Sequence, residues 1–215
     1  MSHPGGRRRS ETDATIELRT LAGSRAGRVV AQLERATEAY AAGRERECTK
    51  LLRPLAEQYP QAAGVRELLG LSLYRAGSYA AAQKELTAFT DLTRSLDQHP
   101  TLMDCARAQR HYKQVDRLWE ELRTGSPAAP LVTEGRIVAA GALADQGRLS
   151  EAIAMLERRS GDVRRVQEHH LRLWYVLADL RERSGDLPGA RALFQKIRKN
   201  DPGFADVAER LAALA

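Results

Sequence analysis

Five stretches of the 215-residue sequence align without gaps, and together they decide the fold that we expect. They are AGRERECTKLL (42–52), AGSYAAAQKEL (76–86), QRHYKQVDRLW (109–119), QGRLSEAIAML (146–156) and SGDLPGARALF (184–194). Their second column holds a glycine in four stretches and Arg110 in the third, at spacings of 34, 33, 37 and 38 residues. Repetition at this period is typical of helical-repeat architectures.

Two further columns indicate how each stretch packs. Five residues after the turn position stands a small or short side chain, which is Cys48, Ala82, Val115, Ala152 or Ala190. Nine residues after it stands a large apolar one, which is Leu52, Leu86, Trp119, Leu156 or Phe194. A glycine after a helix supplies the positive φ of a chain reversal, and helical residues four apart share one face. Each unit is therefore expected to be an antiparallel helix pair that buries one apolar face by stacking on its neighbours.

The residues between these stretches set the expected boundaries. Apolar stripes with helical period precede the turns, as in Leu173, Trp174, Leu177 and Leu180, and no alternating strand pattern competes with them. Prolines separate the units. We expect a repeat domain over 27–215, with repeats near 29–62, 63–95, 96–132, 133–170 and 171–202 and a capping helix over 203–215. Residues 1–26 are expected to be a basic, flexible leader with room for a short helix at its end.

The chain resembles the tetratricopeptide-repeat (TPR) family, with about five repeats. In the second repeat Leu69-Gly70, Tyr74, Gly77, Tyr79 and Ala82 stand at the family's spacing, and the fifth matches at Trp174, Gly185, Ala190, Phe194 and Pro202. The resemblance implies an all-α, right-handed TPR-like α-solenoid of antiparallel helix pairs. It also implies a non-enzymatic scaffold that binds a protein or peptide in a concave groove lined by the first helix of each repeat.

Residues at i, i+4 and i+7 of those first helices share a face, which gives the candidate groove residues. They are Tyr40, Glu67, Leu71, Tyr74, Arg75, Asp104, Arg107, Tyr175, Asp179, Glu182 and Arg183. Tyrosine and arginine anchor many interfaces. The alternative is that the tyrosines pack against neighbouring repeats. The lysine/asparagine clamp of some TPR co-chaperones is missing, since the only asparagine is Asn200, in the last linker.

The sequence carries no recognisable catalytic, cofactor-binding or metal-binding motif. Phosphate-binding glycine loops are absent. No two histidines stand four apart, and the adjacent His169 and His170 point about 100° apart on a helix, so they do not readily chelate one ion. Cys48 and Cys105 are interpreted as packing thiols of a reducing compartment. We therefore expect no enzyme, no cofactor and no metal.

The charge balance leaves a second class of function open. The chain has 34 basic and 28 acidic residues, and all but five of the basic ones are arginine, which is typical of a GC-rich, bacterial genome. Arg158, Arg159, Arg164 and Arg165 flank a short insertion and form a possible patch for an anionic partner, or simply a solvated loop. With Arg7–Arg9 they suggest an RNA- or ribosome-associated accessory protein, which the near-neutral remainder of the chain disfavours.

A third alternative is a TPR sensory or activation domain of a bacterial regulator, although no DNA-binding segment accompanies it. We expect a cytoplasmic protein, because the longest apolar stretch, residues 137–144, is far too short to span a membrane. The polar residues after Arg9 also argue against a signal peptide.

Overall fold

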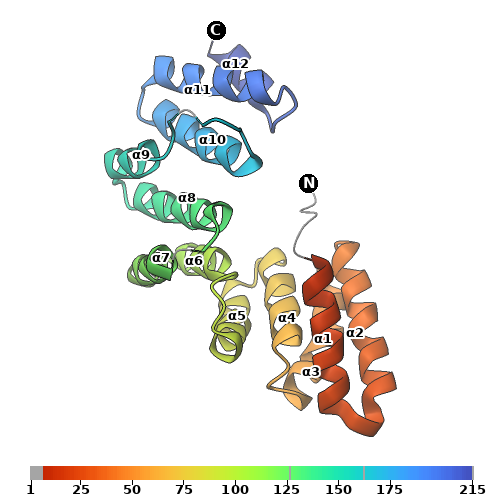
Figure 1. The fold of residues 1–215 in the computed structure, drawn as a ribbon. Helices are drawn as coiled ribbons and strands as arrows, with labels where there is room; N and C mark the ends of the chain where they lie inside the picture. Colours follow the sequence, from red (N-terminus) through yellow and green to blue (C-terminus); the bar gives the residue numbers. More distant parts are fainter. Residues whose placement is uncertain (1–6, 126, 162, 215) are drawn as a thin grey trace. The chain divides into compact units, whose positions relative to one another are not determined.

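The computed structural model describes residues 7–125, 127–161 and 163–214, and every regular element in this part of the chain is helical (Figure 1). The helices are α1 (Arg7–Ala22), α2 (Ala26–Ala41), α3 (Glu45–Gln58), α4 (Ala63–Arg75), α5 (Tyr79–Thr93), α6 (His99–Ala108), α7 (Tyr112–Gly125), α8 (Ala129–Asp145), α9 (Leu149–Glu157), α10 (Glu168–Arg183), α11 (Leu187–Asn200) and α12 (Val207–Ala213). A 3₁₀ turn over Gly23–Arg25 joins α1 to α2. The expected all-α class is confirmed.

The turn column joins the two helices of each pair. Gly43, Gly77, Gly147 and Gly185 have φ values between 69° and 87°, the left-handed region in which glycine carries no steric cost. Arg110 takes the same conformation, with φ of 60°, between α6 and α7. Its amide donates to the Arg107 carbonyl at 2.9 Å, as the amide of Gly77 does to that of Tyr74. The third turn therefore forms without its glycine.

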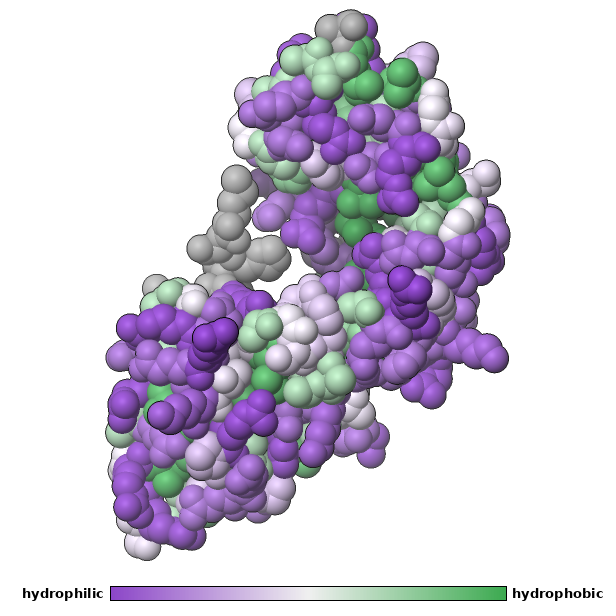
Figure 2. Space-filling model, turned by 180° about the vertical axis from the view of Figure 1, so that it is seen from behind, coloured by the Kyte–Doolittle hydropathy of each residue, from purple (hydrophilic) through white to green (hydrophobic). Residues whose placement is uncertain are grey.

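The chain divides into two compact units, Met1–His111 and Tyr112–Ala215. The first holds α1 to α6, and the second holds α7 to α12. The boundary falls in the turn between α6 and α7, so the third helix pair is shared between the units. On the face shown in Figure 2, hydrophilic side chains cover most of the surface of each unit, and apolar residues are scattered between them.

The two packing columns form much of the core. All five residues of the small column are fully buried, as are Leu52, Leu86, Leu156 and Phe194 of the large column. Gly70 on α4 leaves room for this packing, since a Cβ there would lie 2.6 Å from the Leu86 side chain. Trp119 is the exception, because it remains partly exposed. The small–large pattern therefore predicts which of these side chains are buried, with this indole as the exception.

Helix α1 extends the first unit beyond the predicted repeats. Residues 1–6 of the expected leader lie outside the described residues, but the backbone is helical from Arg7 onward. Helix α1 packs against both α2 and α4, and Leu18 is fully buried in the core of the unit. A buried leucine ties this helix to the fold by apolar burial. Much of the segment expected to be a flexible leader is thus a packed helix.

A carboxylate on α1 also caps α4. The backbone amides of Ala63 and Gly64 donate to the two Glu17 carboxylate oxygens at 2.9 and 3.1 Å. These amides lie in the first turn of α4, where a helix has unpaired donors and attracts negative charge. Gly64 also lets α1 approach closely, because a Cβ there would lie 2.2 Å from the Ala14 Cβ and 2.9 Å from its Cα.

Arg110→Gly is expected to stabilise the protein by about 0.5–1 kcal/mol. The substitution relieves the cost of a left-handed arginine, and the greater flexibility of the unfolded chain offsets only part of this gain. Chemical denaturation measures the change. The matched control is Arg46→Gly, in the exposed part of helix α3, which is expected to cost about 1 kcal/mol. A destabilised Arg110→Gly protein would contradict the strain at this turn.

Gly64→Ala is expected to loosen α1 and to cost roughly 1–3 kcal/mol, because the added methyl group overlaps the Ala14 backbone. Hydrogen exchange of the α1 amides measures this directly, and their protection should fall. Gly27→Ala is the control, since a Cβ at Gly27 meets no atom within 4 Å. Unchanged α1 protection in Gly64→Ala would show that the close contact with Ala14 is not needed to hold this helix.

Candidate functional site

The candidate groove residues fall into two groups, one in each unit. Tyr40 lies near the end of α2, four candidates lie on α4, and Asp104 and Arg107 lie on α6, so seven of them belong to the first unit. Tyr175, Asp179, Glu182 and Arg183 lie on α10, in the second unit. All eleven occupy the first helix of a pair.

In the first unit, α2 and α4 are joined by an arginine over an aromatic ring. The guanidinium carbon of Arg75 lies 3.8 Å from the Tyr40 ring centroid, within the range of a cation–π interaction. Its Nη1 also donates to the Tyr40 backbone carbonyl at 3.2 Å. Tyr40 is half-buried against the core, while Arg75 is exposed. This contact leaves Arg75 accessible to a partner.

A hydrogen bond between side chains joins α4 to α6. The Tyr74 hydroxyl donates to Asp104 Oδ2 at 2.7 Å, and Arg107 Nη1 lies 3.6 Å from Asp104 Oδ1. Burial raises the pKa of Tyr74 above its ordinary value, and the bond to Asp104 raises it further. The phenol therefore remains a neutral donor at physiological pH. Tyr74 and Arg107 both keep part of their surface exposed beside this bond.

Glu67 and Leu71 extend this surface along α4. Glu67 Oε1 accepts a hydrogen bond from Gln98 Nε2 at 2.8 Å, and Leu71 is partly exposed. Glu67, Leu71 and Tyr74 follow Gly64 on one stripe of the helix, at i+3, i+7 and i+10. Because Gly64 contacts α1, that helix occupies the beginning of the predicted groove face. Tyr74 lies about 15 Å further along α4.

In the second unit, the candidate residues of α10 hold the C-terminal helix. The Tyr175 hydroxyl donates to Asp206 Oδ1 at 2.6 Å. Arg210 Nη2, on α12, lies 3.0 Å from Asp179 Oδ1 and 2.8 Å from Glu182 Oε2. Burial lowers the pKa of Arg210, but the hydrogen bonds to Glu182 and Asp179 outweigh it and raise the pKa above its ordinary value. Internal contacts therefore take up most of this face.

Asp206 and Arg210 were not among the sequence candidates, although the sequence contains a signal for one of them. Tyr74 binds an aspartate 30 residues later, and Tyr175 binds one 31 residues later. Tyr74 thus links α4 to α6, and Tyr175 links α10 to the residue before α12, which favours the alternative that these tyrosines pack between repeats. A tyrosine in a first helix followed by an aspartate 30 or 31 residues later is the signal that points to Asp206.

The arginine patch lies in the connection between α9 and α10. Arg158, Arg159, Arg164 and Arg165 are all exposed. Asp162, in the middle of this connection, lies outside the described residues, as do the side chains of Arg7–Arg9. The structure thus places the four arginines in one loop of the second unit.

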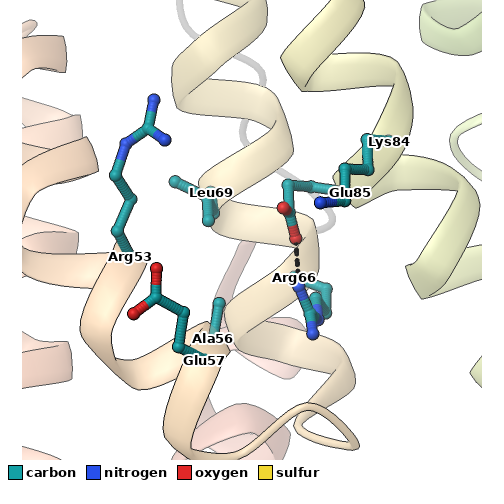
Figure 3. A pocket seen from close by; sticks show the side chains of 7 residues that line it. All are labelled: Arg53, Ala56, Glu57, Arg66, Leu69, Lys84 and Glu85. Carbon is teal, nitrogen blue, oxygen red and sulfur yellow. Dashed lines mark hydrogen bonds and ion pairs between the residues drawn. The ribbon is translucent and has the colours of Figure 1, made fainter.

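A pocket of about 260 Å³ opens between α3, α4 and α5, and no candidate groove residue lines it (Figure 3). Arg66 on α4 and Glu85 on α5 form an ion pair of 2.5 Å inside it, with side chains 16% and 13% exposed. Arg53, Glu57 and Lys84 complete its charged lining. Because the opposite charges partly neutralise each other, the lining does not favour a ligand of one sign.

In residues 7–125, 127–161 and 163–214, no group of three or more His, Cys, Asp or Glu side chains could hold a metal ion. Over the same ranges, none of the helices combines the length and the apolar character that a membrane crossing requires.

Comparison with known proteins agrees with the helix-pair architecture. Two models of the tetratricopeptide repeat match the chain, one over residues 27–91 and the other over residues 143–214. A thermophilic TPR protein of Thermus thermophilus is similar in structure over 86% of this chain and 98% of its own, at 19% sequence identity and a TM-score of 0.62. PilF of Pseudomonas aeruginosa is similar over 89% of this chain and 90% of its own, at 12% identity and a TM-score of 0.57. No curated protein matches the sequence.

The structural likenesses concern the fold alone, since both identities are low. The two repeat models together cover more than half of the chain. TPR repeats are generally protein–protein interaction modules and are typically non-enzymatic. With its glycine turns, its buried small–large columns and its antiparallel helix pairs, the chain belongs to the tetratricopeptide-repeat family.

Proposed function

We propose that this protein is a non-enzymatic scaffold that binds a segment of a protein partner along α4 and α6 of the first unit. The main support is the row of partly exposed side chains formed by Leu71, Tyr74 and Arg107. It combines an apolar and an aromatic group of α4 with a cationic group of α6. The chain belongs to a repeat family whose members generally bind proteins. We name this row the α4–α6 surface.

The internal contacts of the α4–α6 surface favour binding with little ordering cost. Tyr74 is held by Asp104, and Asp104 also lies beside Arg107, so neither side chain needs to be immobilised when a partner arrives. Fixing a side chain rich in rotamers on binding costs about 0.5–1.5 kcal/mol, which a preorganised surface avoids in part. Arg75, fixed over Tyr40, extends this preorganised row toward α2.

Contacts in the second unit also favour the first unit as the binding site. Tyr175, Asp179 and Glu182 are engaged by Asp206 and Arg210, so a partner at the equivalent place on α10 would have to displace α12. We therefore assign partner binding to the first unit and capping of the stack to this part of the second. Cytoplasmic location is part of the proposal, supported by the buried, free thiols of Cys48 and Cys105.

Site-specific crosslinking in cells tests the proposal. A photoreactive amino acid at Leu71 is expected to trap a protein partner, because that side chain borders Tyr74 on the α4–α6 surface. The matched control is the same amino acid at Thr87, which is exposed on α5, the second helix of the pair. Mass spectrometry identifies the adducts, and a partner trapped from Leu71 and absent from Thr87 is the expected outcome.

With that partner purified, Tyr74→Ala and Arg107→Ala are expected to weaken binding by roughly 2 kcal/mol or more if each is a central anchor. Thermal melts of both variants identify any loss of folding. Equal trapping at Leu71 and Thr87 would refute the proposal. So would unchanged affinity in both alanine variants.

A further inference from the structure

Trp119 on α7 is the large-column residue that the fold leaves partly exposed. Helix α8 crosses it at Gly135, where a Cβ would lie 2.2 Å from Leu122 Cδ2 and 3.4 Å from the indole ring. This close approach brings the next residue, Arg136, over the ring, with its guanidinium carbon 5.3 Å from the ring centroid. Trp119 thus forms a platform for an arginine.

Arg136 differs from other arginines of its unit. It is only partly exposed, and no carboxylate partner accompanies it among the residues that the structure describes. By contrast, Arg172 pairs with Glu134 at 2.7 Å, and Arg181 pairs with Glu157 at 2.7 Å. A partly buried cation without a counter-charge is costly for the folded protein and is characteristic of binding sites.

Three other arginines act electrostatically on Arg136. Burial lowers its pKa, and Arg159, Arg123 and Arg158 lower it further. Arg123 is bound to Glu120 on its own helix at 2.5 Å, so its charge is already compensated. Arg136, Arg158 and Arg159 remain as a cationic group from α8 and the end of α9, which we call the Arg136 cluster.

The chain beside Arg158 and Arg159 is held in place. The Ser160 carbonyl accepts hydrogen bonds from the Trp174 indole at 2.9 Å and from Lys196 Nζ at 3.3 Å. Lys196 also lies over the Trp174 ring, 4.1 Å from its centroid. Two donors from α10 and α11 therefore anchor the loop that carries both arginines. This anchoring fixes the backbone next to Arg158 and Arg159, whose side chains remain exposed to a partner.

We propose that the Arg136 cluster binds a short acidic segment of a protein partner, with Arg136 and the exposed Arg158 and Arg159 forking its carboxylates above Trp119. Arginine is suited to this role because its planar guanidinium can donate two parallel hydrogen bonds to a carboxylate. The inference is independent of the α4–α6 surface, since it concerns another unit and other residues.

The size and surroundings of the cluster favour a short acidic segment over a nucleic acid. The second unit as a whole is nearly neutral, with 17 basic and 15 acidic residues between Tyr112 and Ala215. Glu120 on α7, Glu134 on α8 and Glu157 on α9 interrupt the basic surface around the cluster, so it is short. An extended phosphate chain needs a basic stripe to follow, whereas clustered arginines suffice for an acidic motif.

Fluorescence anisotropy with a labelled hexaglutamate peptide tests the inference on the full chain. Wild-type protein is expected to bind it, and Arg136→Gln is expected to weaken binding roughly tenfold or more, because the central fork is lost. The matched control is Arg198→Gln, at an exposed arginine on α11. This substitution removes the same charge and is expected to change the affinity less than about twofold. Arg136→Lys should fall between wild type and Arg136→Gln, since it keeps the charge and loses the planar fork.

The double variant Arg158→Gln/Arg159→Gln changes only exposed side chains, so it is expected to fold normally. It should weaken hexaglutamate binding as Arg136→Gln does. Thermal melts of Arg136→Gln should show no loss of stability, since the change removes an unpaired cation beside like charges. Absence of hexaglutamate binding, or equal losses in Arg198→Gln and Arg136→Gln, would overturn the inference. Tighter binding of hexauridylate, lost in the same variants, would reassign the cluster to RNA.

Discussion

The fold depends on one repeated contact, in which a small side chain four residues before a large one lets two helices approach. All five small-column residues are fully buried, and four of the five large-column residues are buried beside them. A single helix pair encloses too little apolar surface to be stable alone, so each pair relies on its neighbours. The side chains of this packing face the neighbouring helices. The candidate groove residues lie on another face of each first helix, and that face is left for other roles.

Two helices of the protein cover much of that groove face. Helix α1 covers the beginning of the α4 stripe and caps α4 through Glu17, and α12 covers the α10 stripe through Arg210. Both helices shield apolar residues that a terminal repeat would otherwise expose. What remains accessible in the first unit is the α4–α6 surface, where Tyr74 and Arg107 flank Asp104. The two caps and the proposed partner site thus use the same face of different first helices.

Charge pairing distinguishes Arg136 from three other arginines of the second unit. Arg172, Arg181 and Arg210 each have a carboxylate within 3.0 Å. Arg136 instead lies over an indole and beside other arginines, which is an unfavourable arrangement for the isolated chain. Groups that lower the stability of a folded protein are often retained for binding, because a ligand supplies the missing counter-charge.

The sequence by itself determined the helix pairs, because turn glycines and small–large columns act within one repeat. Even Arg110, which replaces a turn glycine, takes the same left-handed backbone conformation. It also identified the stripe on α4 from helical spacing. Only the tertiary structure decided what covers each stripe. The Glu17 cap joins residues 46 and 47 positions apart, and the Arg210 contacts join residues 28 and 31 positions apart. Such contacts depend on how close the packed helices come, as Gly64 and Gly135 allow, and a periodic pattern carries no measure of that distance.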